Sequence, residues 1–224
     1  GRAIVEHLAR HGAKVVVSSR KPEACDKVTA ELRAAGHDAV SIPCNVGLKA
    51  ECEALVDRTV AHFGGLDILV CNAATNPYYG PMDGMSDEAY DKIMITNVKG
   101  SFWLCNKAAP VIAARGGGAI ILLSSIGGFR GNSVIGIYGV SKAAEAQLAR
   151  NLAVEWGPKN IRVNAIAPGL IKTDFARALW EDPVRRAKSE EQNPLRRIGE
   201  PEDIAGIAVM LASAAGAYIT GQVI

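Results

Sequence analysis

The chain has 224 residues, enough to bury the core of one large domain or two small ones. A formal net charge of +2, with no long run of Lys and Arg, argues against a protein that binds nucleic acid electrostatically. Hydrophobic residues make up 49% of the chain but aromatic residues only 5%, which predicts an aliphatic interior.

Helical and extended patterns alternate along the whole chain. Residues 3–10 carry apolar side chains at helical spacing, and residues 13–18 form a β-branched run typical of a buried strand. Four more pairs of helix and strand follow in order, at 22–35 and 38–44, 49–63 and 66–71, 86–114 and 119–124, and 138–156 and 161–166. A last helix is predicted at 201–212, and a last strand begins in 218–224. This alternation predicts an α/β fold with a doubly wound, Rossmann-like parallel sheet, in a single domain that spans residues 1–224.

The five cysteines are scattered and lack the close pairs and histidine partners of a zinc site, so we expect no metal. An odd number of unpaired thiols is typical of a reducing compartment, and we expect a cytoplasmic protein. No apolar run approaches the length of a membrane span, and no signal peptide is visible, so we expect no membrane partner. Targeting signals beyond either end of the chain would be invisible here.

Polar or small residues follow five of the predicted strands at the point where each strand ends. In an open parallel sheet the ligand lies beyond the carboxyl ends of the strands. A set of five such ends therefore indicates a long ligand that crosses the sheet edge, and a dinucleotide is the obvious candidate. The segments concerned are Ser18–Arg20, Cys44–Val46, Cys71–Ala74, Ser124–Ser125 and Ala167–Gly169.

Tyr138 and Lys142 stand four residues apart in a predicted helix, which places both side chains on one helix face. A phenol with an ordinary pKa near ~10 is a poor acid–base catalyst at neutral pH, and a nearby ammonium lowers that pKa by favouring the phenolate. Ser125, brought in by another strand, can hold a carbonyl oxygen where the phenol delivers its proton. The alternative for the pair alone is an amphipathic helix with a surface lysine and a half-buried tyrosine.

Further motifs accompany this constellation, namely Asn72-Ala73-Ala74, Asn97, and Pro168-Gly169 followed by Thr173. With Ser125 and Tyr138-x-x-x-Lys142 they resemble, over nearly the whole chain, a member of the short-chain dehydrogenase/reductase family. The resemblance implies that Tyr138 is the general acid/base, that Lys142 lowers the pKa of Tyr138 and holds the nicotinamide ribose, and that Ser125 orients the substrate oxygen. It also implies that Asn97 supports a proton-relay water near a helix kink. Without the resemblance, Asn97 would be a helix-interior residue that hydrogen-bonds its own backbone.

The end of strand 13–18 bears on the choice of cofactor. An acidic residue there accepts hydrogen bonds from the adenosine ribose of NAD, whereas a basic residue meets the extra phosphate of NADP. Ser19 occupies the acidic position, and Arg20 and Lys21 follow it, which is similar to NADP(H) users and makes NAD(H) the weaker candidate. The alternative is an arginine near a helix cap that points to water.

The resemblance implies further cofactor contacts around this sheet edge. Asn45 replaces the family's usual aspartate near the adenine, and either side chain accepts a hydrogen bond from the amino group. The complete set of expected cofactor residues is Gly1, Ser19, Arg20, Lys21, Asn45, Val46, Asn72, Ala73, Tyr138, Lys142, Pro168, Gly169, Ile171 and Thr173.

Both ends of the chain depart from the family pattern. Gly1 matches only the last glycine of the family's glycine-rich turn, and the first strand and most of that turn are missing. Because that strand normally lies in the middle of the sheet, its absence leaves unpaired backbone groups and an apolar slot between its neighbours. We therefore expect this sequence to be a shortened form of a longer chain, lacking about 10 to 20 residues or more at its start. Residues 221–224 resemble the beginning of the family's final strand.

Residues 173–199 resemble the family's variable substrate lid, with Phe175, Leu179, Trp180 and Leu195 among charges. Tyr78 and Tyr79 are candidates for the opposite wall, and ordinary packing of a helical flap is the alternative for all of these side chains. Several phrases resemble the NADPH-dependent carbonyl (retinal) reductase branch, which implies a small-molecule ketone or aldehyde as substrate. Those phrases are Val15 to Lys21, Asn72 to Pro77, and Pro168 to Thr173.

Two other functions remain open at this point. A 3-oxoacyl-carrier-protein reductase shares the fold, cofactor and catalytic residues, and would need a basic patch for its acidic carrier. A nucleotide-sensing regulator without catalysis would keep the fold, but it would have no need of Asn97, Ser125, Tyr138 and Lys142 together. The Ala-rich helices that begin near Ser101 and Tyr138 predict close pairing across a two-fold axis, and hence a homotetramer or homodimer.

Overall fold

The computed structural model describes residues 1–224, and all its strands run parallel. β1 (Val15–Val17) pairs with β2 (Ala39–Ser41) in one group. In the other group, β3 (Ile68–Cys71), β4 (Gly118–Leu123) and β5 (Ile161–Ile166) pair in that order. Parallel strands linked by helices confirm the predicted α/β class. The two groups of strands are separate, since β1 and β3 are not hydrogen-bonded to each other, and this interruption of the sheet lies where the slot between neighbouring strands was predicted.

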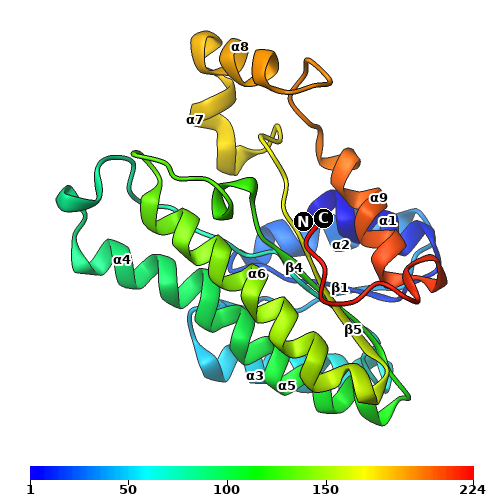
Figure 1. Ribbon diagram of the computed structural model, residues 1–224. Coiled ribbons are helices and arrows are strands. Elements are labelled where there is room, and N and C mark those ends of the chain that lie inside the picture. The colour runs from blue at the N-terminus through cyan, green and yellow to red at the C-terminus, as the bar shows by residue number, and fades with distance from the viewer.

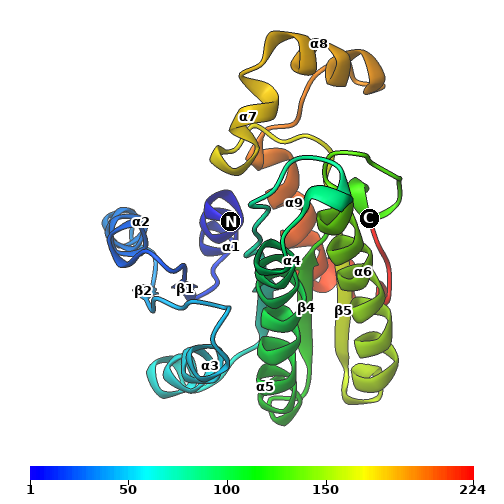
Figure 2. The same ribbon diagram turned by 90° about the vertical axis from the view of Figure 1, so that its left-hand side faces the viewer.

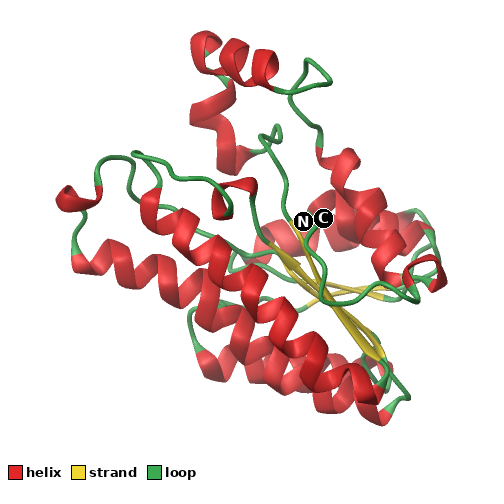
Figure 3. Ribbon diagram, viewed as in Figure 1, coloured by secondary structure: helices red, strands yellow, loops and turns green.

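Helices cover both faces of the strand layer (Figures 1 and 2). One face carries α3 (Lys49–Phe63), α5 (Gly100–Ala114) and α6 (Gly136–Trp156). The other face carries α1 (Arg2–Arg10), α2 (Pro22–Ala34) and α9 (Pro201–Ala212), with α1 packed against α9. Figure 3 shows the strands enclosed between these two layers of helices.

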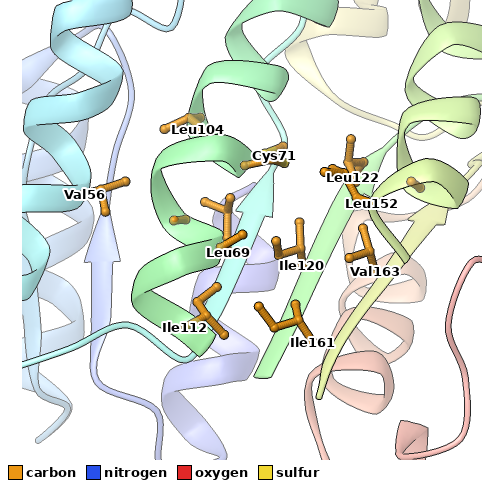
Figure 4. Close-up of a cluster of buried hydrophobic side chains, with 14 of the residues drawn as sticks. Val56, Leu69, Cys71, Leu104, Ile112, Ile120, Leu122, Leu152, Ile161 and Val163 are labelled. Atoms are coloured by element: carbon orange, nitrogen blue, oxygen red, sulfur yellow. The ribbon is translucent and has the colours of Figure 1, made fainter. Parts of the chain in front are cut away.

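Side chains along β4 alternate between two hydrophobic cores. Ile120 and Leu122 belong to the core under α3, α5 and α6, which Figure 4 shows in close-up. Ile121 and Leu123 belong to the core under α1, α2 and α9. Successive residues of a strand point to opposite faces, so a strand buried on both faces has to be apolar throughout. This is why the segment was recognisable as a buried strand from its sequence, and the second core also joins β1 to β4 across the interruption.

The long helix predicted at 86–114 is divided in three. It consists of α4 (Asp87–Ile93), the π-helical segment η2 (Met94–Lys99) and α5. Ser86 caps the start of α4, and its side-chain oxygen accepts a hydrogen bond from the Ala89 N–H at 3.3 Å. A π-helical turn holds an extra residue and changes the direction of the side chains after it, which makes it common at functional sites. The helix irregularity expected near Asn97 is therefore present.

The segment after β5 projects beyond the sheet as a separate helical layer (Figure 1). It contains the 3-10 turn η5 (Asp174–Ala176), α7 (Arg177–Trp180) and α8 (Pro183–Gln192). The remaining 3-10 turns are η1 (Met82–Gly84), η3 (Ile126–Gly128), η4 (Gly157–Lys159) and η6 (Ala214–Gly216). None of the helices combines the length and the apolar character needed to cross a membrane.

The strand expected within 218–224 is reduced to a single bridge. Val223 pairs with Ala165 in the parallel sense, and the Ile224 N–H donates to the Ala165 carbonyl at 3.0 Å. Gly221 has a φ of +71°, so the backbone just before the bridge is left-handed rather than extended. The extended pairing follows Gly221, and the Ile224 carbonyl accepts from the Ala167 N–H at 2.7 Å.

Candidate active site

Tyr138 is half-buried on the first turn of α6, close to the end of β4. Ser125 caps η3, and its side-chain oxygen accepts a hydrogen bond from the Gly127 N–H at 3.1 Å. A Cβ atom on Gly127 would lie 3.4 Å from Ser125 Oγ and 3.9 Å from Tyr138 Cε1, so Gly127 sits between the two side chains. The structure thus brings the predicted acid/base and the predicted orienting hydroxyl to one place.

The pKa of Tyr138 is raised to about 12, chiefly because burial disfavours the phenolate. The Ser125 hydroxyl lowers the pKa, while the negative charge of Glu145 and the neighbouring Tyr79 raise it. The phenol is consequently protonated at neutral pH. Lys142 is not among the groups that shift this pKa here, and the reason lies in the contacts of the lysine.

Lys142 turns its ammonium into the protein rather than toward the Tyr138 hydroxyl. Its Nζ donates to the Leu123 carbonyl at 2.7 Å and to Glu145 Oε2 at 2.6 Å. The same Nζ lies 5.5 Å from the centroid of the Tyr138 ring, which confirms that the two side chains share a helix face. Because the Glu145 carboxylate balances the ammonium, the phenol gains little from the lysine charge.

Asn97 lies in the middle of η2 with no exposed surface. Its Oδ1 accepts from the Thr75 N–H at 2.8 Å, and its Nδ2 donates to the Thr75 carbonyl at 3.1 Å and to Ser141 Oγ at 3.0 Å. The side chain therefore joins the loop after β3 to α6 and does not bond to its own helix backbone. Its main-chain carbonyl accepts from Ser101 Oγ at 3.1 Å.

The residues expected to select the cofactor follow β1 on the surface. Ser19, Arg20 and Lys21 are all exposed. The Ser19 hydroxyl accepts from the Lys21 N–H at 3.2 Å and fixes the turn into α2. The charged ends of Arg20 and Lys21 consequently stand in water beside the end of the strand, where an anionic group could reach them.

The other expected cofactor contacts border the same edge. Asn45 Oδ1 accepts from the Gly47 N–H at 3.1 Å, and the Val46 carbonyl packs so closely on Gly100 that a Cβ there would approach it to 2.6 Å. Asn72 and Ala73 are exposed at the end of β3. A Cβ on Gly1 would meet Asn72 Nδ2 at 2.8 Å, which places the start of α1 beside this strand end.

The remaining expected contacts connect β5 to the helical layer above the sheet. The Pro168 carbonyl accepts from the Ile126 N–H at 3.1 Å, and Gly169 follows on the surface. Ile171 bridges to Gly199, so the two ends of the 173–199 segment are tied together. Thr173 caps η5, and its side-chain oxygen accepts from the Ala176 N–H at 3.4 Å.

Aromatic rings border the Tyr138 hydroxyl. The Phe175 ring centroid lies 6.0 Å from that of Tyr138, at an interplanar angle of 36°. Tyr79 is near enough to influence the pKa of Tyr138. By contrast, the Tyr78 hydroxyl donates to the Pro81 carbonyl at 2.8 Å, and Trp180 Nε1 donates to the Thr173 carbonyl at 2.7 Å. Phe175 and Tyr79 thus face the candidate site, while Tyr78 and Trp180 hold their own loops.

Glu145, which pairs with Lys142 at 2.6 Å, was not among the residues predicted from the sequence. The carboxyl group has no exposed surface, and its Oε1 accepts from Ser101 Oγ at 3.3 Å. Burial raises the pKa of Glu145 to about 7, against the opposing effect of the Lys142 ammonium. The signal was available, because a glutamate three residues after Lys142 interrupts the alanine stripe of a helix face that otherwise reads as buried.

The chain is similar to known proteins over its full length. A protein-family model described as Enoyl-(Acyl carrier protein) reductase matches residues 1–224. Dehydrogenase/reductase SDR family member 4 of Sus scrofa is 44% identical over 224 residues, which are 100% of this chain and 80% of that protein.

Solved structures similar to this chain include proteins with bound nicotinamide cofactors. A gluconate 5-dehydrogenase from Burkholderia cenocepacia J2315 in complex with NADP and tartrate has a TM-score of 0.95 and 29% identity, covering 100% of this chain and 88% of that one. A 7α-hydroxysteroid dehydrogenase complexed with NADH and 7-oxo glycochenodeoxycholic acid has a TM-score of 0.96 and 36% identity, covering 100% of this chain and 87% of that one. Since the same fold serves both cofactors, the choice between them has to rest on local residues.

Proposed function

We propose, from the fact that this chain belongs to the short-chain dehydrogenase/reductase family, that it reduces the carbonyl group of a ketone or aldehyde to an alcohol with NADP(H). It is an oxidoreductase. The observation that carries the proposed direction is a phenol beside a serine hydroxyl at the end of β4, with its pKa raised to about 12. Such a phenol is protonated at neutral pH and can donate its proton, and a positive charge brought near it would make it a stronger acid.

The residues at the sheet edge fit NADP(H). Arg20 and Lys21 are exposed and can bind the additional phosphate, for which a guanidinium is especially well suited. Helix α1 has no side-chain cap and no acidic residue in its first turn, so its N–H groups remain free for a pyrophosphate. When bound, the nicotinamide supplies hydride to the carbonyl carbon.

The protein side chains handle the proton. Ser125 donates a hydrogen bond to the substrate oxygen and holds it next to the Tyr138 hydroxyl. As negative charge develops on that oxygen, Tyr138 transfers its proton and is left as a phenolate. Lys142 stabilises the phenolate, and Asn97 keeps the loop after β3 and α6 in register through Thr75 and Ser141. The product is an alcohol, and the phenol recovers a proton from solvent.

The site favours a flat apolar substrate. Phe175 and Tyr79, which are 49% and 45% exposed, offer aromatic surface next to Tyr138. A 3-oxoacyl-carrier-protein reductase is less well supported. Its acidic carrier would need a basic patch at the mouth of the site, for which Arg130, Arg177 and Arg185 are the candidates, and two of these arginines already have acidic partners. Arg177 pairs with Asp174 and Glu181, and Arg185 pairs with Asp182 at 3.3 Å.

Replacing Tyr138 by Phe tests the function. We expect Tyr138→Phe to lower kcat for carbonyl reduction by about 10²-fold to 10⁴-fold, while the Kd for NADPH changes little, because only the proton donor is lost. Turnover would be followed by NADPH absorbance with a panel of aromatic and aliphatic ketones and aldehydes, and with an acyl-carrier-protein thioester. Unchanged turnover in Tyr138→Phe would contradict the assignment. An unmodified chain that binds NADPH without any turnover, and whose regulatory output hardly changes in Tyr138→Phe, would favour a nucleotide sensor.

A second copy of the chain is proposed to pack against α5 and α6, in a homodimer or homotetramer. A hollow on the outer surface of η2, α5 and α6 is lined by four apolar and three polar residues. The apolar residues are Val98, Phe102, Ala144 and Leu148, and the polar ones are Lys99, Gln147 and Asn151. A cytoplasmic location is also proposed, supported by five buried cysteines that are all unpaired.

A further inference from the structure

A continuous polar network crosses the apolar core between α5 and α6. Ser101 Oγ lies 3.1 Å from the Asn97 carbonyl and 3.3 Å from Glu145 Oε1, and its single proton serves one of these acceptors at a time. Lys142 Nζ donates to Glu145 Oε2 and to the Leu123 carbonyl. Lys142 is 1% exposed and Glu145 is 0% exposed. Both charges are removed from water here. The ion pair is therefore retained because either charge alone would pay a large desolvation penalty.

The Lys142 ammonium cannot keep its hydrogen bonds in the core and also reach the Tyr138 oxygen. Two of its three N–H groups are taken by Glu145 and Leu123, and both acceptors lie on the core side of α6. Under the proposed function, the same ammonium has to stabilise the Tyr138 phenolate. The contact of Lys142 with Glu145 therefore competes with the contact of the same ammonium with the Tyr138 phenolate.

No other anionic group near Glu145 could replace it as the partner of the Lys142 ammonium. The titratable groups facing the carboxylate are Lys142 and Tyr138 on α6 and Cys71 on β3, with Cys105 of α5 behind Cys71. The pKa of Cys71 is raised, first by its hydrogen bond with Cys105 and then by burial, so this thiol is neutral. Glu145 is consequently the negative charge that balances Lys142.

We propose that Glu145 is a positioning residue that retains the Lys142 ammonium in the core and releases it toward Tyr138 when nucleotide binds. This inference rests on the proposed function. Release leaves the carboxylate buried without its cation, which favours its protonation, so nucleotide binding is coupled to uptake of a proton by Glu145. In the retained state the negative charge of Glu145 adds to the effect of burial in raising the pKa of the Tyr138 phenol.

The first test needs neither cofactor nor substrate. The phenol of Tyr138 would be titrated by ultraviolet difference spectroscopy after rapid pH jumps, with Tyr138→Phe subtracted to isolate its signal. Glu145→Gln keeps the side-chain shape but removes the charge, and we expect it to lower the Tyr138 midpoint by about one pH unit or more. Ser101→Ala is the matched control, because it removes a hydrogen bond from the network and leaves the charge of Glu145 in place. An unchanged midpoint in Glu145→Gln, or an equal fall in Ser101→Ala, would overturn the proposal.

The second test measures the unmodified chain directly and uses Glu145→Gln as its reference. Calorimetry of NADPH binding just above neutral pH, in buffers of different ionisation enthalpy, counts the protons taken up. We expect roughly one proton more for the unmodified chain than for Glu145→Gln. If the unmodified chain takes up none, the release mechanism is wrong even if Tyr138→Phe has confirmed the carbonyl reductase activity.

Discussion

Individual side chains at this sheet edge are already committed to structural hydrogen bonds, and this determines which remain free to bind ligands. The Ser19 hydroxyl bonds the Lys21 backbone, and Asn45 Oδ1 bonds the Gly47 N–H. Arg20, by contrast, is exposed at the end of β1. Discrimination between NADP and NAD should therefore depend on Arg20 more than on its neighbours.

Replacing Arg20 by Ala tests this assignment. We expect Arg20→Ala to raise the Kd for NADPH by about 10-fold to 100-fold, because a charge-assisted hydrogen bond is worth roughly 1.5 to 3 kcal/mol. The Kd for NADH should change little, since NADH has no additional phosphate. Fluorescence titration with both cofactors measures this, and Lys27→Ala on the exposed side of α2 is the control. Equal weakening of both cofactors would contradict a role in phosphate recognition.

At the scale of elements, β4 connects the two cores and carries the site at its end. Ile120 has no exposed surface and contributes to the core under α5 and α6. The turn η3 and Ser125 follow directly from this strand, so the rigidity of β4 also fixes the position of the Ser125 hydroxyl. Loosening the strand should therefore affect stability first and catalysis second.

Ile120→Ala should reduce the free energy of unfolding by about 2 to 5 kcal/mol, because the deletion leaves a cavity between close-packed layers. Urea unfolding followed by circular dichroism gives the value. Val154→Ala on α6 is the matched control, since Val154 is 81% exposed and its truncation should change stability by no more than about 0.5 kcal/mol. A loss at Ile120 as small as at Val154 would mean that β4 is not the common core element.

At the scale of the whole molecule, the exposed faces of α5 and α6 remain without a partner in the monomer. Phe102 is 45% exposed and lines the hollow between these helices together with Leu148. A second copy would cover this apolar surface, and a two-fold axis would bring the same faces of both copies together.

Phe102→Asp should therefore convert an assembled protein into monomers without loss of helical structure, because a charge would be buried in the interface. Light scattering gives the mass, and circular dichroism checks the fold. Val184→Asp is the control, since Val184 is 76% exposed and α8, which carries it, belongs to the helical layer that projects beyond the sheet (Figure 2). A monomeric unmodified chain would refute the proposed assembly.

The sequence alone was sufficient for the order and type of the main elements and for the grouping of Ser125 with Tyr138. Apolar periodicity is local, so it identifies a helix such as 49–63 or a doubly buried strand such as β4 without knowledge of distant contacts. Strand ends in a parallel sheet share an edge, so the candidate site also followed from chain order. The π-helical turn itself, with its change of register at 94–99, could not be placed to the residue in this way.

Tertiary structure decided the electrostatics of that site. Asn97 bonds Thr75 and Ser141, which are 22 and 44 residues away along the chain. Lys142 was expected to serve Tyr138, yet Glu145 and the Leu123 carbonyl hold its ammonium in the core. Spacing fixes which helix face a side chain occupies, but the pKa of Tyr138 depends on desolvation and on which charges other elements bring near. Burial of the phenol and the position of Glu145 relative to it are determined only when the helices have packed against the strands.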